Sequence, residues 1–487
     1  MSAPLTPKEI YERMQELRNI KKLHEAARRR VLQQHARIKE LEAQNTAKDA
    51  IILSQAKMIQ QLQLRVEELE RMVFGKKKKQ EAHDPDTLVS PPKPRTPRST
   101  DSYHRPIPTE AEITHHQQHT LSTCPVCGGA VVHKETSVVY EEDIVLPTKD
   151  TKPGKTVTKH TVERGYCPHC HQWHSAAPHL TAAVFMGEKV QLYICYLSII
   201  IRLSFGQIAT LLETTYALSV SDGEIAKILL RESRHLRPAY EVLKVGIQRQ
   251  KGVHYDETPW KVGHGGQGNF AWVMVGAEST DAVFVCGKSR GKGVAETLRG
   301  RSRGVGISDD YGAYRTLFTY HQLCFAHPHR KLRDLATSDT LERSVQDTCR
   351  KTFAAFGTLY QDVRMELAKE WHAQRNKAAR GRFMARLRRI SVSHPDDPKK
   401  LTQIKEGLGR NLANYFTCLL HSGIPCDNNK AERALRHLVL KRKVSFGSKT
   451  AQGAEATAVL LSVLLSLFWR KPNDFFGEYM ALRGVGV

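Results

Sequence analysis

A run of short apolar segments after Gly252 limits the possible folds more than any other part of this sequence. The segments are separated by turns, and they predict strands over 254–262, 269–275, 282–287, 305–309 and 321–326, with one helix over 291–298. Three strands in succession, then a helix and a fourth strand, predict an α/β sheet of mixed direction. Acidic residues lie within the first strand, at Asp256, and at the end of the fourth, at Asp309.

A third acid, Glu432, lies at the start of a segment that is typical of a capped helix (427–436). Carboxylates bind hard cations such as Mg²⁺, and a pair of such ions can hold the attacking and leaving oxygens of a phosphodiester. We therefore interpret Asp256, Asp309 and Glu432 as candidate metal ligands. The neighbouring Glu257 is expected on the opposite face of the sheet, because side chains alternate along a strand. Alternatively, Glu432 forms an ion pair with Arg436, one helical turn further on.

The chain carries a strong positive charge. Its 487 residues include 74 Lys and Arg against 50 Asp and Glu, a net charge of +24, and exceed what one compact core accommodates. Such a surplus favours a polyanionic partner, since basic side chains displace counterions from phosphates. The alternative is a basic surface with no such partner.

Four of the ten cysteines form two Cys-x-x-Cys pairs, Cys124 with Cys127 and Cys167 with Cys170. This arrangement favours a structural zinc ion held by four thiolates in a reduced cytosol rather than a secreted disulfide framework. A histidine next to the second pair is an alternative ligand; the candidates are His169, His171 and His174.

An apolar heptad with β-branched residues at one core position and leucine at the other predicts a parallel two-stranded coiled coil, and hence a homodimer. The first core position is occupied by Val31, Ile38, Asn45, Ile52, Ile59, Val66 and Val73. Alternatively, this helix packs its apolar stripe against its own protein, or belongs to a leucine-zipper regulator.

Residues 82–118 are rich in Pro, Ser, Thr and His and predict a flexible linker. We expect neither a signal peptide nor a membrane span.

Two further segments suggest contact with DNA. Residues 204–213 and 219–230 predict two capped helices joined by a short turn, an outline that a helix-turn-helix and an ordinary helical pair share. A basic helical stretch further on contains Arg386, Arg388 and Arg389. It fits a surface that faces DNA and a solvated helix face equally well.

Four motifs together resemble the transposases of the insertion sequence 66 family, a branch of the DDE transposases. The motifs are His254-Tyr-Asp-Glu-Thr-Pro, Ser308-Asp-Asp-Tyr-Gly-Ala-Tyr, His321-Gln-Leu-Cys-Phe-Ala-His and Asn428-Asn-Lys-Ala-Glu-Arg-Ala-Leu-Arg. The order of coiled coil, zinc segment, helical segment and catalytic domain matches as well, so the resemblance covers nearly all of the chain beyond residue 30.

The resemblance implies an RNase H-like catalytic domain in which Asp256, Asp309 and Glu432 bind two Mg²⁺ or Mn²⁺ ions. Water would then cut the DNA to leave a 3′-OH, which would attack target DNA by in-line displacement. The resemblance also implies double-stranded DNA as partner, at the element ends and the target, and small accessory proteins of the same element. The expected contacts to DNA are Lys441, Arg442 and Lys443. His327, Arg433 and Arg436 are expected to contact phosphates or to support the metal ligands. Alternatively, His327 is a hydrogen-bonded histidine at the end of a strand.

We expect a multidomain α/β protein of the bacterial cytoplasm, associated with the nucleoid. The alternatives are a zinc-containing DNA-binding regulator without activity, and a nuclease or resolvase that cuts without joining. The expected division is an N-terminal coiled-coil helix (1–75), a linker (76–120), a zinc ribbon (121–178), a helical segment (179–250), the first part of the catalytic core (251–340), a helical insertion (341–424) and the second part of the core with the C-terminal tail (425–487).

Overall fold

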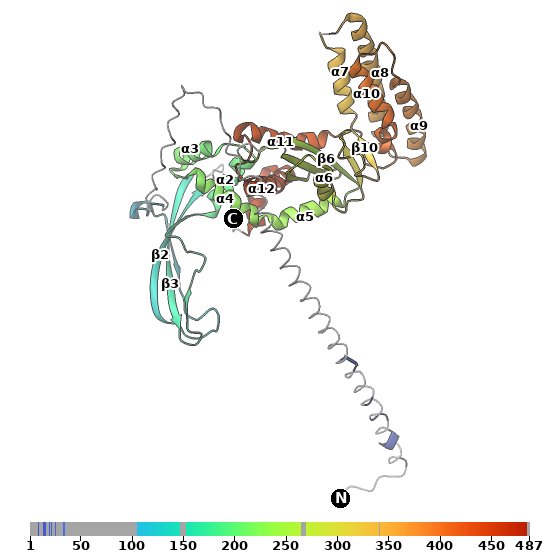
Figure 1. Ribbon diagram of the computed structural model, residues 1–487. Helices are drawn as coiled ribbons and strands as arrows, with labels where there is room; N and C mark the ends of the chain where they lie inside the picture. Colours follow the sequence, from blue (N-terminus) through green and yellow to red (C-terminus); the bar gives the residue numbers. More distant parts are fainter. Residues whose placement is uncertain are drawn as a thin grey trace, which may run out of the picture. The chain divides into compact units, whose positions relative to one another are not determined.

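The computed structural model describes residues 105–146, 152–263, 269–339 and 341–484, with a few isolated positions before residue 35. Apart from those positions, the predicted coiled coil lies outside the described residues, and so does the predicted linker as far as residue 104. The described residues form a mixed α/β architecture of two five-stranded sheets and many helices (Figure 1). The multidomain α/β class is confirmed at this level of detail.

A long antiparallel hairpin between the two Cys-x-x-Cys pairs forms the centre of the first sheet. Its strands pair from Val132 with Tyr166 to Val145 with Gly154. The sheet has the order β1-β3-β2-β5, and β4 pairs with β3. The strands are β1 (His115–His119), β2 (Val132–Val145), β3 (Gly154–Cys167), β4 (Gln172–Ser175) and β5 (Val184–Met186).

The end of the predicted linker is ordered in the structure. A 3-10 turn, η2 (Glu110–Glu112), precedes β1, which pairs in parallel with β3 from His115 with Thr158 to His119 with Val162. The sequence of β1 has no apolar alternation, so its pattern predicts a linker and not a strand. Backbone pairing and the stacking of His119 on His160 hold the segment instead.

Four helices follow the first sheet: α2 (Glu188–Ile199), α3 (Phe205–Tyr216), α4 (Asp222–His235) and α5 (Arg237–Gln248). Ser204 caps α3, and Ser221 caps α4 by accepting a hydrogen bond from the Glu224 amide, as its position before a helical period predicts. Asp143 of β2 accepts hydrogen bonds from two amides in the first turn of α2, which ties the hairpin to these helices.

The second sheet has the predicted mixed direction, with the order β10-β9-β6-β7-β8. β6 pairs with β7 and β7 with β8 antiparallel, whereas β9 is parallel to both β6 and β10. In β7 the residues after Phe270 are all buried, as expected of a central strand covered on both faces. Its elements are β6 (Gly252–Pro259), β7 (Phe270–Gly276), β8 (Ala282–Gly287), α6 (Lys292–Arg299), β9 (Val305–Ser308) and β10 (His321–Leu323).

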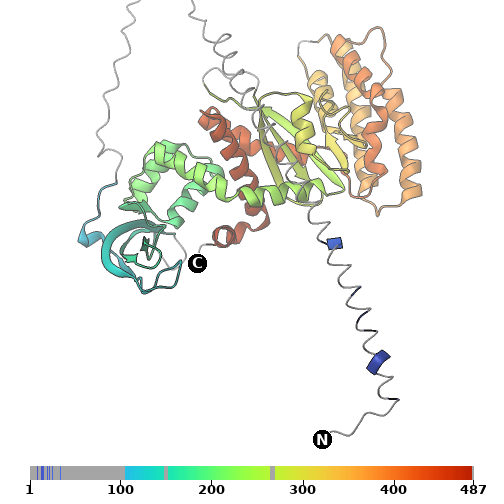
Figure 2. The same ribbon diagram turned by 60° about the horizontal axis from the view of Figure 1, so that its bottom comes forward.

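A group of helices packs beside β10 (Figures 1 and 2). Its core joins Leu323 and Phe325 at the end of the sheet to buried residues of the helices, such as Phe356 and Leu387. The first of these helices begins at Ala326, before the predicted insertion. The elements are α7 (Ala326–Ala336), α8 (Arg343–Leu367), α9 (Ala373–Ile390), α10 (Lys399–Arg410) and the 3-10 segment η3 (Leu412–Leu419).

A buried ion pair stabilises this helical group. The Lys405 ammonium lies 2.7 Å from an Asp397 carboxylate oxygen, and both side chains are at most 5% exposed. Replacing Lys405 by Met leaves a buried carboxylate unpaired, and we expect the variant to lose about 3–5 kcal/mol of stability. Denaturant unfolding monitored by circular dichroism measures the loss. The exposed Lys399 at the start of the same helix is the control: Lys399→Met should leave the unfolding midpoint unchanged, and an equal shift in both variants would contradict a role for the pair.

The C-terminal helices cover the free edge of the second sheet. Ser462 and Ser466 of α12 accept hydrogen bonds from the Phe284 and Ala282 amides of β8, so the edge strand is paired with side chains. α12 is long and apolar enough to cross a membrane, but two thirds of its apolar window is buried against the rest of the protein. The elements are α11 (Asn429–Ser445), α12 (Ala451–Arg470), the 3-10 turn η4 (Pro472–Asp474) and α13 (Phe475–Arg483).

Candidate functional site

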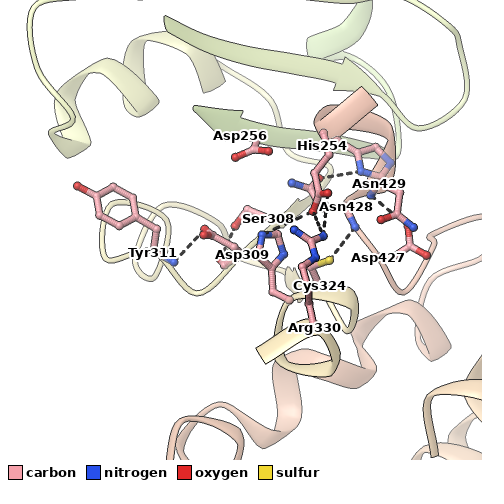
Figure 3. A network of polar contacts seen from close by, with 12 residues as sticks. His254, Asp256, Ser308, Asp309, Tyr311, Cys324, Arg330, Asp427, Asn428 and Asn429 are labelled. Carbon is pink, nitrogen blue, oxygen red and sulfur yellow. Dashed lines mark hydrogen bonds and ion pairs between the residues drawn. The ribbon is translucent and has the colours of Figure 1, made fainter. Parts of the chain in front are cut away.

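The three parallel strands β6, β9 and β10 bring Asp256, Asp309 and Cys324 to the edge of the second sheet where these strands have their carboxyl ends. His254 of β6 is level with Ile307 of β9, so two residues further along Asp256 is level with Asp309. Leu323 of β10 is level with Ser308, which places Cys324 beside Asp309. Residues level with one another in neighbouring strands face the same side of a sheet. Figure 3 labels the three residues, with Asp256 on the strand and Asp309 in the segment next to Tyr311.

Asp309 occupies the bend immediately after β9, one residue beyond the end of the strand. Its carboxylate accepts a hydrogen bond from the Tyr311 amide at 3.0 Å (Figure 3). Ser308, the last residue of β9, helps to fix this bend, because its hydroxyl donates to the Asp309 carbonyl oxygen at 2.8 Å and lies 2.8 Å from the buried His321 ring. The bend thus holds the Asp309 carboxylate at the carboxyl end of the strand.

The surroundings of Asp256 disfavour the charged form of its carboxyl group. Burial raises its pKa well above the usual value, and the nearby carboxylates of Glu257, Asp309 and Glu432 raise it further. Its carboxylate accepts a hydrogen bond from the Glu257 amide at 2.9 Å. A group of carboxylates this close is stabilised by positive charge.

The acids adjacent to Asp256 and Asp309 are engaged elsewhere. Glu257 accepts hydrogen bonds from the Tyr314 hydroxyl and from Arg290, on the face that carries Tyr255, as strand alternation predicts. Asp310 pairs with Arg315 at 3.0 Å. These neighbours therefore have structural partners of their own, whereas Asp256 and Asp309 have no basic partner among the described residues.

The fully buried Asn428 docks the start of α11 onto β6 and β10. Its side-chain amide donates to the Tyr255 carbonyl oxygen at 2.8 Å, and its side-chain oxygen lies 3.0 Å from Nδ1 of His254. Burial lowers the pKa of His254 to about 4, so the ring is neutral and donates from Nδ1 to this oxygen. The backbone amide of Asn428 also donates a hydrogen bond to Cys324 Sγ at 3.0 Å. These bonds fix the helix turn that carries Glu432.

Glu432 is held by α7 rather than by Arg436. Arg330 donates to both of its carboxylate oxygens, at 2.9 and 3.1 Å, and His327 Nε2 lies 3.6 Å from one of them. Cys324, His327 and Glu432 form a group whose ligand atoms lie within 4.8 Å of one another. In the described part of the chain, Asp256, Asp309 and Glu432 do not form such a close group. His254 and Cys324 lie in the sequence motifs, but their roles depend on contacts made in the fold. No local sequence signal identifies Arg330, because its ion pair with Glu432 depends on how α7 packs against α11.

The chemistry of the donors fits a hard divalent cation. Asp256 and Asp309 offer carboxylate oxygens to the same side of the sheet edge, and their mutual repulsion is of the kind that a cation removes. The thiol of Cys324 is already an acceptor for a backbone amide, and burial raises its pKa to about 12.

A groove of about 700 Å³ opens beside Asp309, between the sheet edge and α10. Its walls carry both apolar residues and the basic side chains of Arg315, Lys331 and Lys400. An extended polyanion bound beside Asp309 would contact these basic side chains.

The predicted DNA contacts on α11 divide into two groups. Arg433, Arg436 and Lys443 are exposed, whereas Arg442 is partly buried and donates to the Thr258 hydroxyl at 3.1 Å. Lys441 is buried and donates to the carbonyl and hydroxyl oxygens of Ser198. Burial lowers its pKa to about 8. The prediction that Lys441 contacts DNA is therefore corrected: it lies on the inner face of the helix and joins α11 to α2.

The basic residues of α9 also differ from one another. Arg388 and Arg389 are exposed, but Arg386 lies 2.6 Å from the Asp362 carboxylate of α8. Arg386 therefore has a structural partner within the helical group.

The four cysteines of the two Cys-x-x-Cys pairs converge, with their sulfur atoms within 4.8 Å of one another. Cys124 Sγ lies 3.7 Å from Cys170 Sγ, and Cys127 Sγ lies 3.4 Å from Cys167 Sγ. Four sulfurs about 2.3 Å from a tetrahedral zinc ion would be separated by about 3.8 Å, so the cluster fits zinc. The Cys170 amide lowers the pKa of Cys167 to about 7. His174 Nε2 lies 3.2 Å from Cys170 Sγ, beside the cluster.

Comparison with known proteins agrees with this geometry. Residues 185–456, more than half of the chain, match the family model described as transposase IS66 family. The chain is also similar to the uncharacterized protein y4jD of Sinorhizobium fredii (strain NBRC 101917 / NGR234), with 24% identity over 278 residues. That similarity covers 52% of this chain and 53% of the relative, so the chain spans about half the length of the curated relative that it matches.

Proposed function

Because the chain belongs to the transposase IS66 family, we propose that it cuts the ends of a DNA element and joins the freed 3′-OH to target DNA. The observation that carries the proposal is the placement of Asp256 and Asp309 at one sheet edge, with α11 and Glu432 docked against it by Asn428. This arrangement and the strand order support an RNase H-like catalytic domain.

In this proposal Asp256, Asp309 and Glu432 hold two Mg²⁺ or Mn²⁺ ions. When bound, the pair would activate the attacking oxygen and stabilise the leaving one. The three carboxylates do not all lie within 4.8 Å of one another in the described residues. This spread suits two ions better than one, since two ions lie about 3.5–4 Å apart and spread their ligands. The chain itself contributes the rigid docking of α11 and the neutral His254 behind it.

Double-stranded DNA would bind along the exposed basic residues of α11 and α9: Arg433, Arg436, Lys443, Arg388 and Arg389. The net charge of +24 supports an electrostatic contribution to this binding. Arg442 and Arg386 would contribute only by leaving their present partners.

The remaining predictions complete the proposal. The cysteine cluster would hold a structural zinc ion, and the coiled coil predicted over 1–75 would pair two chains and so two element ends. The proposal also includes small accessory proteins of the same element as partners and a nucleoid-associated location in the cytoplasm. The predicted domain division is part of the same proposal, with the helical insertion extended to include α7.

A cleavage and joining assay on labelled element-end DNA with Mg²⁺ tests the function. Cut ends that become joined to a second duplex are expected. Cut ends that are never joined would favour a nuclease or resolvase. Binding without cutting, even when the element's accessory proteins are supplied, would favour a regulator and contradict the proposal.

Arg330 gives a prediction that does not depend on catalysis. Its guanidinium neutralises Glu432 and adds positive charge beside the proposed ion site. Removing it in Arg330→Met should tighten Mn²⁺ binding in the absence of DNA by up to about fivefold, because a half-exposed ion pair contributes up to about 1 kcal/mol. Titration calorimetry with Mn²⁺ measures the change. The matched control is Arg333→Met, since Arg333 pairs with the adjacent Asp334. Weaker Mn²⁺ binding in Arg330→Met would show instead that Arg330 is needed to position Glu432.

A further inference from the structure

One face of α11 forms a basic stripe that leads away from Glu432. Arg433, Arg436 and Lys443 are exposed and lie at helical spacings that place them on the same side. Between Glu432 and Glu455 the sequence contains no acidic residue. At 1.5 Å per residue, the helix carries this stripe about 21 Å from Glu432 to residue 446, the length of about six base pairs of DNA.

Phe446 ends the stripe in an unusual conformation. It is 79% exposed, and its backbone is left-handed, with φ 59° and ψ 6°. A left-handed residue often follows a helix, but this position is usually glycine, since a side chain is disfavoured there. Here a large apolar ring occupies the strained position and faces solvent. Neither packing nor backbone preference explains a phenylalanine at this site.

The turn that carries Phe446 is firmly anchored. The Phe446 amide donates to the Arg442 carbonyl at 2.8 Å, and the Ser448 amide donates to the Lys261 carbonyl at 2.9 Å. The Trp260 indole donates to the Ser448 hydroxyl at 3.2 Å. Gly447 is necessary for this approach, because a Cβ there would lie 2.3 Å from the Lys261 carbonyl oxygen. The ring is thus presented by a fixed support.

The surroundings of the ring are cationic. Three exposed lysines lie near it in the chain or at the segment that the turn contacts. Lys443 is in the last turn of α11, Lys449 follows the turn, and Lys261 lies just beyond β6, where its carbonyl accepts from the Ser448 amide. An exposed aromatic ring among basic side chains is the combination that binds nucleic acid by stacking on bases while cations hold the phosphates. Aromatic wedges can also enter between base pairs of a duplex and unstack them.

We propose that Phe446 stacks on a nucleobase of the bound DNA, about six base pairs from the phosphate that is cut. The inference rests on the proposed function, because the stripe is measured from Glu432. It assigns to this turn a contact with the bases, in addition to the phosphate contacts of the basic residues.

Element-end duplexes with 2-aminopurine at successive positions test the proposal, because this base fluoresces more strongly when it is unstacked. With the wild-type protein, fluorescence should rise at one or two positions about six base pairs from the cut. Phe446→Gly should abolish the rise and weaken binding by about 5- to 150-fold, the range for loss of one base–aromatic contact. Glycine suits the left-handed backbone, so this variant should fold at least as well as the wild type.

Two further variants separate the ring from its surroundings. Phe446→Tyr should keep the fluorescence change, and Val444→Ala, which alters another exposed apolar residue nearby, should leave both binding and fluorescence unchanged. If Phe446→Gly binds and responds like the wild type while cleavage proceeds, the stacking proposal is overturned and the proposed function stands. If Phe446→Gly instead alters only the oligomeric state, the ring belongs to a contact between copies. A wild type that does not bind element ends would overturn both.

Discussion

Glu432→Gln, Asp256→Asn and Asp309→Asn should each reduce DNA cleavage by ~10³-fold or more while leaving DNA affinity nearly unchanged. Each change removes one charged oxygen donor from the proposed ion pair, which would supply several kcal/mol of transition-state stabilisation. The replacements keep the size of the side chains, and Asp256 loses the repulsion that raises its pKa, so the fold should not suffer. Single-turnover cleavage of labelled ends with Mg²⁺ measures the rate, and gel-shift titration measures the affinity.

The chain offers a closely matched control for this series. Asp310 is adjacent to Asp309 but pairs with Arg315 instead of facing Asp256. Asp310→Asn should therefore cleave within a few-fold of the wild type. Comparable losses in Asp309→Asn and Asp310→Asn would show that the effect comes from the turn after β9 and not from a specific ligand.

Loss of the cysteine cluster should give the second large effect. Cys127→Ser removes one of four converging thiols, and we expect the purified protein to lose its bound zinc. Structural zinc sites contribute about 10–16 kcal/mol of apparent binding free energy near neutral pH, far more than this small segment can replace by packing. Metal analysis of the purified protein and hydrogen exchange over residues 121–178 measure the two consequences.

The expected loss of order is local. Ile144 and Met186, at the other end of this sheet, belong to the large apolar core that continues into the second sheet, so the hairpin should stay attached there. Cys286→Ser is the control, because Cys286 lies on β8 away from the cluster and its bond to the Ala454 carbonyl can be kept by a hydroxyl. Full zinc content in Cys127→Ser, or a protein that never contains zinc, would contradict the assignment.

Local sequence patterns predicted the second sheet well. Apolar runs bounded by turns identified β6 to β10. The structure adds that β9 is parallel to β6, which brings the acid at the end of the fourth run level with Asp256. The cysteine pairs and the cap at Ser221 were equally accessible, since each depends on spacing within a few residues.

Contacts between distant segments were not predictable in the same way. Arg330 reaches Glu432 across more than a hundred residues, and Asn428 bonds to strands far earlier in the chain. The basic sequence around Lys441 predicts a surface cation, but in the structure its ammonium group faces inward and donates to the Ser198 carbonyl oxygen. The strand β1 has a polar, unpatterned sequence, and its pairing with β3 and the stacking of His119 on His160 order it. These features depend on tertiary packing, which periodicity and propensity do not encode.

The most direct test of strand transfer uses element ends that are already cut. A duplex with a free 3′-OH at its end is incubated with target DNA, Mg²⁺ and either the wild type or Glu432→Gln, and a matched duplex with a 3′-deoxy end serves as control. The account predicts joined products only with the wild type and the 3′-OH end. Joining by Glu432→Gln at the wild-type rate, or no joining by the wild type even when the element's accessory proteins are supplied, would contradict it.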